Sequence, residues 1–173
     1  MTIIGITGKA GSGKTTAAKV LVDRGFMKLS FATPVKEIAK MFGWDGKKDD
    51  RGRRLLQLIG TEIGRWYDDR IWVKKMAQRI LDIEETNKYY QDQTMIVIDD
   101  VRFDNEAKLI KELDGFVIEL KGNAFYQEGF LATHTSERGV SKSVIDYSWD
   151  FPFYNSVEEF SGVFADKVKW LIG

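Results

Sequence analysis

The chain has 173 residues, which is the length of one domain with one sizeable core. It contains no cysteine and one histidine, which excludes a disulfide framework, a thiol nucleophile and a metal site built from several imidazoles. Its 26 basic residues balance 26 acidic ones and no apolar run is long enough to cross a bilayer, so we expect neither nucleic acid nor membrane as a partner. Nothing resembles a secretion signal or a linker, so we predict one cytoplasmic domain over residues 1–173.

The chain opens with a strand, a glycine-rich loop and a helix. Thr2–Thr7 is short, apolar and β-branched, which is typical of a buried strand, and Lys14–Asp23 carries apolar residues at helical spacing. Phe26–Phe31 is predicted to be a second strand. Thr33 and Pro34 then indicate the N-cap and first residue of a helix.

Two more helices are predicted before the next strand, near Arg51–Tyr67 and Asp69–Thr86, so residues of about 33–88 form a helical excursion. The apolar residues at helical spacing in these two segments are Leu55, Leu56, Leu58, Ile59, Ile63, Val73, Met76, Ala77, Ile80 and Leu81.

Alternation of strands and helices resumes after the excursion. Thr94–Ile98 is predicted to be a strand, Asn105–Leu113 a helix and Phe116–Leu120 a strand. Residues of about 121–142 have no clear period and many small polar residues, so we predict a lid loop.

The last two predicted elements are an edge strand and a closing helix. Asp150–Tyr154 contains Pro152, which suits the edge of a sheet, and Ser156 with Glu159 forms a capping box. The inner side of the closing helix is predicted to carry Val157, Phe160, Phe164, Val168 and Leu171. Together these elements predict a three-layer α/β fold with a parallel sheet of about five strands.

The segment Gly8–Thr15 matches the phosphate-binding pattern G-x-x-x-x-G-K-[ST] in full, between an apolar strand and a helix. Its glycines allow successive backbone N–H groups to point into one concavity, and the helix N-terminus adds positive potential. Lys14 can reach the β- and γ-phosphates, and the Thr15 hydroxyl can ligate Mg²⁺. The motif therefore predicts a nucleoside triphosphate site.

Two carboxylates and an arginine follow the strand that ends at Ile98. Open parallel sheets bind ligands at this edge, so either Asp99 or Asp100 is a candidate for the magnesium shell, through water, while the other meets the acceptor. Arg102 can present a planar fork to a phosphate, and its alternative is a surface ion pair.

The remaining motifs favour a small phosphotransferase over other nucleotide-binding proteins. No guanine-reading N-K-x-D follows a strand, and the chain is too short for a two-lobed motor. The excursion offers Lys36, Arg53 and Arg54 to an acceptor phosphate, and Trp72 offers a flat face to a base. Solvated charges and a core tryptophan are the alternatives.

Several longer motifs resemble the phage-type deoxynucleoside monophosphate kinases. The resemblance runs in order over nearly the whole chain and rests on GKAGSGKTT, FATPVKEIAKMFG, RRLLQLIGTEIGRWYDDRIWVKKM, DDVRFDNEA, HTSE and YNSVEEF. It implies the P-loop nucleotide kinase fold and transfer of the γ-phosphate of ATP to a deoxynucleoside monophosphate with Mg²⁺.

The resemblance also assigns residues to the two nucleotide sites. The ATP site would comprise Gly11, Ser12, Gly13, Lys14, Thr15, Thr16 and, on the adenine side, Asn155. The deoxynucleotide site would comprise Lys36, Arg54, Gly60, Thr61, Trp72, Asp100, Arg102 and Glu106, with Arg53 as a neighbour. Lys14, Asp100 and Arg102 are the predicted catalytic residues.

The lid and the competing hypotheses stay open at this point. The lid contains His134 and the basic residues Lys121, Arg138 and Lys142, any of which is a candidate to contact the transferring phosphate. A kinase of another metabolite, such as dephospho-coenzyme A, and a non-catalytic ATP-binding switch are the alternatives. A homodimer is compatible with the resemblance and has no signature in the residues.

Overall fold

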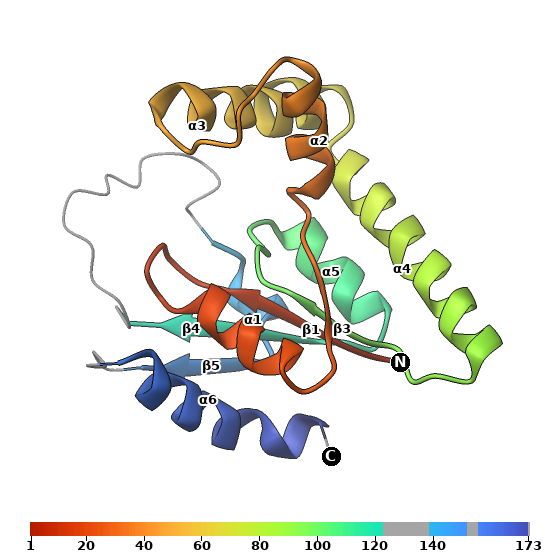
Figure 1. Cartoon of the computed structure of the whole chain (residues 1–173), viewed down its shortest axis with the longest axis vertical. Helices are drawn as coiled ribbons and strands as arrows, with labels where there is room; N and C mark the ends of the chain where they lie inside the picture. Colours follow the sequence, from red (N-terminus) through yellow and green to blue (C-terminus); the bar gives the residue numbers. More distant parts are fainter. Residues whose placement is uncertain (123–138, 152–155, 173) are drawn as a thin grey trace. The chain divides into compact units, whose positions relative to one another are not determined.

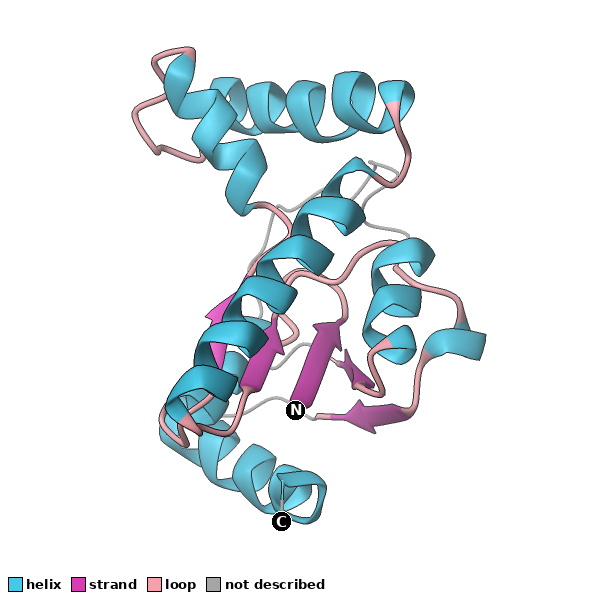
Figure 2. Ribbon diagram, turned by 90° about the vertical axis from the view of Figure 1, so that its right-hand side faces the viewer, coloured by secondary structure: helices cyan, strands magenta, loops and turns pink. Residues whose placement is uncertain are grey.

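The computed structural model describes residues 1–122, 139–151 and 156–172, and the chain divides into two compact units. The first, called the sheet unit, consists of Met1–Leu29 and Asp92–Gly173 and contains all the strands (Figure 1). The second, called the helical unit, consists of Ser30–Gln91 and contains only helices and loops (Figure 2). The helical unit covers the stretch in which the sequence predicts a helical excursion.

Five parallel strands form the sheet in the order β2-β3-β1-β4-β5. The strands are β1 Thr2–Thr7, β2 Met27–Leu29, β3 Met95–Ile98, β4 Phe116–Lys121 and β5 Tyr147–Asp150. The strand that leads into the glycine-rich loop, β1, lies at the centre. The predicted α/β class and the parallel five-stranded sheet are confirmed.

The last strand lies at the predicted edge but earlier in the chain than predicted. The sequence prediction of Asp150–Tyr154 is wrong in its bounds, because the strand that pairs with β4 is Tyr147–Asp150. Tyr147 and Trp149 alternate with more exposed residues and pack against the core, which is the period of two expected of a half-buried strand. Residues 152–154 lie outside the described residues.

Helices cover both faces of the sheet (Figure 1). One face packs against α1 Lys14–Val22 and α6 Val157–Ile172, and its core contains Ile4, Ile6, Phe160 and others. The other face receives α5 Asp104–Glu112, whose buried residues pack on β1 and β4. This arrangement gives the three layers that alternating strands and helices predict.

The closing helix α6 agrees with its predicted inner face except at its first residue. Phe160, Phe164 and Val168 are fully buried, and the Glu159 N–H donates to Ser156 Oγ at 3.1 Å, as one half of the capping box. Val157 is 47% exposed, so the prediction that it faces inward is wrong. It lines a surface groove between α6 and α1 instead.

The helical unit contains four helices where three were predicted. They are α2 Thr33–Met41, α3 Asp50–Gln57, the π-helix η1 Leu58–Arg65, and α4 Ile71–Tyr90. The segment predicted as one α-helix over Arg51–Tyr67 thus widens to π geometry after Gln57. A wider turn changes the direction of later side chains, and Ile63 is 60% exposed instead of inward-facing. Thr33 is the first residue of α2 and Ala32 is its N-cap, one residue earlier than predicted.

Candidate nucleotide-binding and phosphotransfer site

The glycine-rich loop between β1 and α1 has the backbone geometry of a phosphate cradle. Gly8, Gly11 and Gly13 have φ values of 140°, 77° and 91°, which residues other than glycine rarely adopt. A Cβ atom on Gly8 would also lie 2.4 Å from the Leu120 carbonyl oxygen, so the loop passes very close to β4. The first turn of α1 carries no acidic residue, so no carboxylate there would repel an anion at the helix N-terminus.

Polar side chains complete this cradle. The Lys14 ammonium donates to the carbonyl oxygens of Gly8 at 2.7 Å and Lys9 at 2.6 Å, which holds it over the loop. Ser12 is 1% exposed, and its hydroxyl is buried without a hydrogen-bond partner among the described residues. Such a group is costly unless a ligand supplies the partner. Thr15 is exposed in the first turn of α1, so the loop fits a triphosphate and its magnesium ion.

The carboxyl end of β3 brings the two predicted acids and Arg102 to the same edge of the sheet. β1 and β3 are parallel neighbours with Gly5 opposite Ile98, and the Val101 N–H donates to the Ile6 carbonyl oxygen at 3.3 Å. The segments that follow the two strands, the phosphate loop and Asp99–Arg102, therefore leave the sheet at one edge. This is where open parallel sheets bind their ligands.

The two acids differ in their surroundings. The Lys28 ammonium on β2 lies 2.5 Å from Asp99 Oδ2, and the Asp99 side chain is 10% exposed. The negative charge of Asp99 is therefore compensated by the Lys28 ammonium on the neighbouring strand β2. Lys28 was not a predicted site residue, and its place opposite the end of β3 depends on strand order, which no local pattern specifies.

Glu106 is directed at the backbone and not outward. It is 2% exposed, and its Oε2 accepts hydrogen bonds from the N–H groups of Arg102 at 2.8 Å and Phe103 at 3.2 Å. The described contacts of Glu106 are thus with the backbone of the turn, and its place in the acceptor site stays a prediction. Arg102 itself is exposed.

A neighbouring acid, Asp104, binds Ser141, which lies near the end of the predicted lid. Its two carboxylate oxygens accept from the N–H and the hydroxyl of Ser141, the former at 2.6 Å. These hydrogen bonds, above all the one from the Ser141 hydroxyl, hold the pKa of Asp104 below its usual range. This contact joins residues 37 positions apart, and the sequence gives no signal for it.

Trp72 supports the helical unit from inside. It is 3% exposed, and its indole N–H donates to the Gly60 carbonyl oxygen at 2.7 Å. A Cβ atom on Gly64 would lie 2.5 Å from the Trp72 ring, so only glycine allows this packing. A buried ring does not offer a free face to a base, and we correct the stacking interpretation accordingly. Of the two alternatives, the core tryptophan agrees with the structure.

The other predicted acceptor residues of the helical unit lie on elements that pack together. Gly60 approaches Val35 of α2, next to the half-buried Lys36. Arg54 on α3 forms a two-pronged ion pair with Glu62 on η1, in which Nη2 lies 3.3 Å from Oε2. Thr61, beside Glu62, is half-buried. The predicted acceptor residues therefore divide between the helical unit and the sheet unit.

Some predicted residues lie outside the described residues. They are Asn155 on the predicted adenine side and His134 and Arg138 of the lid. Of the other lid cations, Lys121 lies 3.6 Å from Glu119, and Lys142 is exposed at the start of the short helix η3 Lys142–Val144. The role of each lid residue stays a prediction.

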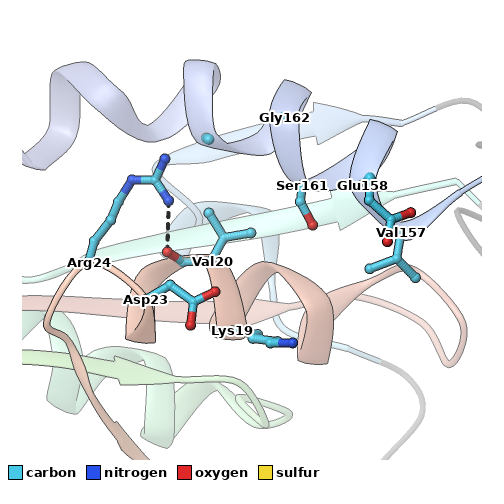
Figure 3. Close-up of a pocket in the computed structure, with 9 residues that line it drawn as sticks. Lys19, Val20, Asp23, Arg24, Val157, Glu158, Ser161 and Gly162 are labelled. Carbon is cyan, nitrogen blue, oxygen red and sulfur yellow. Dashed lines mark hydrogen bonds between the residues drawn. The ribbon is translucent and has the colours of Figure 1, made fainter.

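A groove of about 390 Å³ lies between α1 and α6 (Figure 3). Its lining carries charges of both signs: Lys19 from α1, Asp23 and Arg24 directly after α1, and Glu158 from α6. It is built from the half of α1 that is remote from the phosphate loop, and none of the predicted site residues lines it. We therefore assign it no part in phosphate binding.

The parallel sheet with a phosphate loop after its central strand has the fold of the small P-loop kinases. Solved structures of this class share the fold: the Acinetobacter baumannii shikimate kinase has a TM-score of 0.51 at 12% identity, over 99% of this chain and 92% of that one. The Sinorhizobium meliloti gluconokinase has a TM-score of 0.50 at 14% identity, over 98% and 93%.

Sequence comparison identifies the family. The model of the deoxynucleotide monophosphate kinase family matches residues 44–148. A protein of Acanthamoeba polyphaga mimivirus, provisionally named a deoxynucleotide monophosphate kinase, is 35% identical over 92% of each chain. The deoxynucleoside-5'-monophosphate kinase of Escherichia phage T5 is 32% identical over 55% of this chain and 37% of its own length. The chain belongs to the deoxynucleotide monophosphate kinase family.

Proposed function

We propose that the protein transfers the γ-phosphoryl group of ATP to a deoxynucleoside monophosphate. An oxygen of the acceptor phosphate forms the new bond to the γ-phosphorus, and the bond from that phosphorus to the β,γ-bridging oxygen breaks, which gives a deoxynucleoside diphosphate and ADP. The observation that carries the proposal is the phosphate loop, with the unpartnered buried hydroxyl of Ser12 and the ammonium of Lys14 held above it. Family membership supports the acceptor class.

The chain's own residues would act mainly by position and charge. The loop residues Gly11–Thr16 would bind the phosphates of ATP, and Lys14 and Arg102 would share the negative charge that develops during transfer. Lys36, Arg54, Gly60 and Thr61 would bind the acceptor. Asn155 remains the residue expected near adenine.

A magnesium ion, when bound, would neutralise charge on the phosphate oxygens. Within the described residues, no cluster of three or more acidic or imidazole side chains could hold a metal by itself, so most ligands would come from phosphate and water. Thr15 and Asp100 are the groups that we propose would hold it. Asp99 is the weaker candidate, because Lys28 already compensates its charge.

The test is a coupled assay for ADP with each of the four common deoxynucleoside monophosphates and with none. Shikimate, gluconate and dephospho-coenzyme A serve as acceptor controls, and Lys14→Ala is the inactive control. We expect ADP only with a deoxynucleoside monophosphate. ADP formation with another acceptor, or turnover that no acceptor accelerates, would contradict the proposal.

Oligomeric state and location are separate proposals. No helix in the described parts of the chain is long and apolar enough to cross a membrane. The cytoplasmic location and the homodimer stay predictions. Light scattering of the purified protein tests the homodimer, and a mass of one 19.8 kDa chain would contradict it.

A further inference from the structure

The turn that carries Arg102 is bound at three consecutive backbone amides. The Val101 N–H donates to the Ile6 carbonyl oxygen on β1, and the N–H groups of Arg102 and Phe103 donate to Glu106. Val101 is 2% exposed and Arg102 is exposed. The backbone is therefore fixed on both sides of a side chain that projects outward.

The Glu106 carboxylate is an unusual group to bury. It is 2% exposed, and a buried carboxylate is costly unless hydrogen bonds or charges compensate it. Here the two amides and the N-terminal end of α5, of which Glu106 is the third residue, provide that compensation. The bond from the Phe103 N–H is one half of a capping box, in which the third residue of a helix accepts from the N-cap amide. The bond from the Arg102 N–H lies one residue outside that box, so capping α5 does not account for it.

We propose that Glu106 is a positioning residue that sets the direction of Arg102, and that it does not touch the acceptor. The inference rests on the proposed function, in which Arg102 meets phosphate charge. An error of about 1 Å in a positioned group can lower turnover about 100-fold. The hydrogen bonds from the amides of Arg102 and Phe103 to Glu106 would therefore affect turnover although Glu106 does not contact the substrate.

Reach and charge can be separated by two substitutions. Glu106→Asp keeps the charge but withdraws the oxygens from the two amides, whereas Glu106→Gln keeps a carbonyl oxygen at the same reach and removes the charge. We expect kcat/KM for the monophosphate to fall about 10- to 100-fold in Glu106→Asp and clearly less in Glu106→Gln. Glu112→Asp, an exposed change on the same helix, is the matched control and should equal the wild type.

A double-mutant cycle with Arg102→Ala tests whether Glu106 acts through Arg102. In the Arg102→Ala background, Glu106→Asp should produce no further loss, and the dissociation constant of a non-hydrolysable ATP analogue should be unchanged in every variant. Additive losses, a greater loss in Glu106→Gln than in Glu106→Asp, or weaker analogue binding would overturn the inference. Absence of monophosphate-dependent ADP in the wild type and in Glu112→Asp would contradict the proposed function instead.

Discussion

Replacing Trp72 by phenylalanine separates a supporting role of this ring from a stacking role. The substitution removes the donor to the Gly60 carbonyl at 2.7 Å and leaves a void in a site that is 3% exposed. An unsatisfied carbonyl costs about 1 to 3 kcal/mol and the smaller ring adds a cavity cost, so we expect a loss of about 2 to 4 kcal/mol. Each kcal/mol lowers the Tm of a chain of this size by roughly 2 to 4 °C.

Thermal unfolding followed by far-ultraviolet circular dichroism measures this loss. Trp66→Phe is the matched control, because Trp66 lies in the same unit and is 84% exposed, and it should change stability by less than about 0.5 kcal/mol. The KM values for ATP and for the monophosphate are measured below the melting range. An unchanged Tm in Trp72→Phe together with a raised KM for the monophosphate alone would refute the supporting role and restore the stacking interpretation.

Four further perturbations test other parts of the site. Lys14→Ala should remove about 3 to 4 kcal/mol of transition-state stabilisation, measured as a lower kcat/KM, while the protein stays folded. Near-normal turnover would contradict the role of Lys14, and Lys19→Ala on the same helix should leave kcat/KM unchanged. Arg54→Ala should raise the KM for the monophosphate much more than that for ATP, whereas equal effects would remove Arg54 from the acceptor site. Gly8→Ala should abolish binding of a fluorescent ATP analogue, since its Cβ would lie 2.4 Å from the Leu120 oxygen, and normal binding would refute the cradle geometry. Because the folded-state pKa of Asp104 is lowered, its stabilising contact with Ser141 is complete above the ordinary value near 3.8 and is lost as the pH falls through the lowered pKa. Urea unfolding should therefore show wild type more stable than Asp104→Asn at pH 7, with the difference shrinking in acid; a constant difference would exclude this linkage.

Local patterns predicted most of the elements. The apolar β-branched runs identified β1 and β3, and the complete phosphate-binding motif located the loop that joins β1 to α1. These patterns depend on neighbours in sequence, which is why they can be read without a structure. The π-helix at Leu58–Arg65 was not predicted, because a change from α to π geometry leaves the composition helical while it redirects single residues such as Ile63.

Pairings between distant residues could not be predicted. Lys28 meets Asp99 only because β2 and β3 are neighbours in the sheet, and Ser141 meets Asp104 across 37 positions. Resemblance placed Trp72 and Glu106 in the acceptor site, but it could not distinguish a residue that contacts a ligand from one that supports such a residue. Burial and hydrogen-bond partners make that distinction, and both are properties of the fold.

The order of the strands has a consequence for how this family can diversify. All the strands come from residues before Ser30 and after Gln91, so every ladder pairing is independent of the helices that the chain inserts after β2. The pairing of β1 with its neighbours, and the phosphate loop that follows β1, therefore involve no residue of that insertion. The proposed acceptor residues Lys36, Arg54, Gly60 and Thr61 all lie in this insertion, so substitutions among them would change the proposed acceptor site without touching a strand.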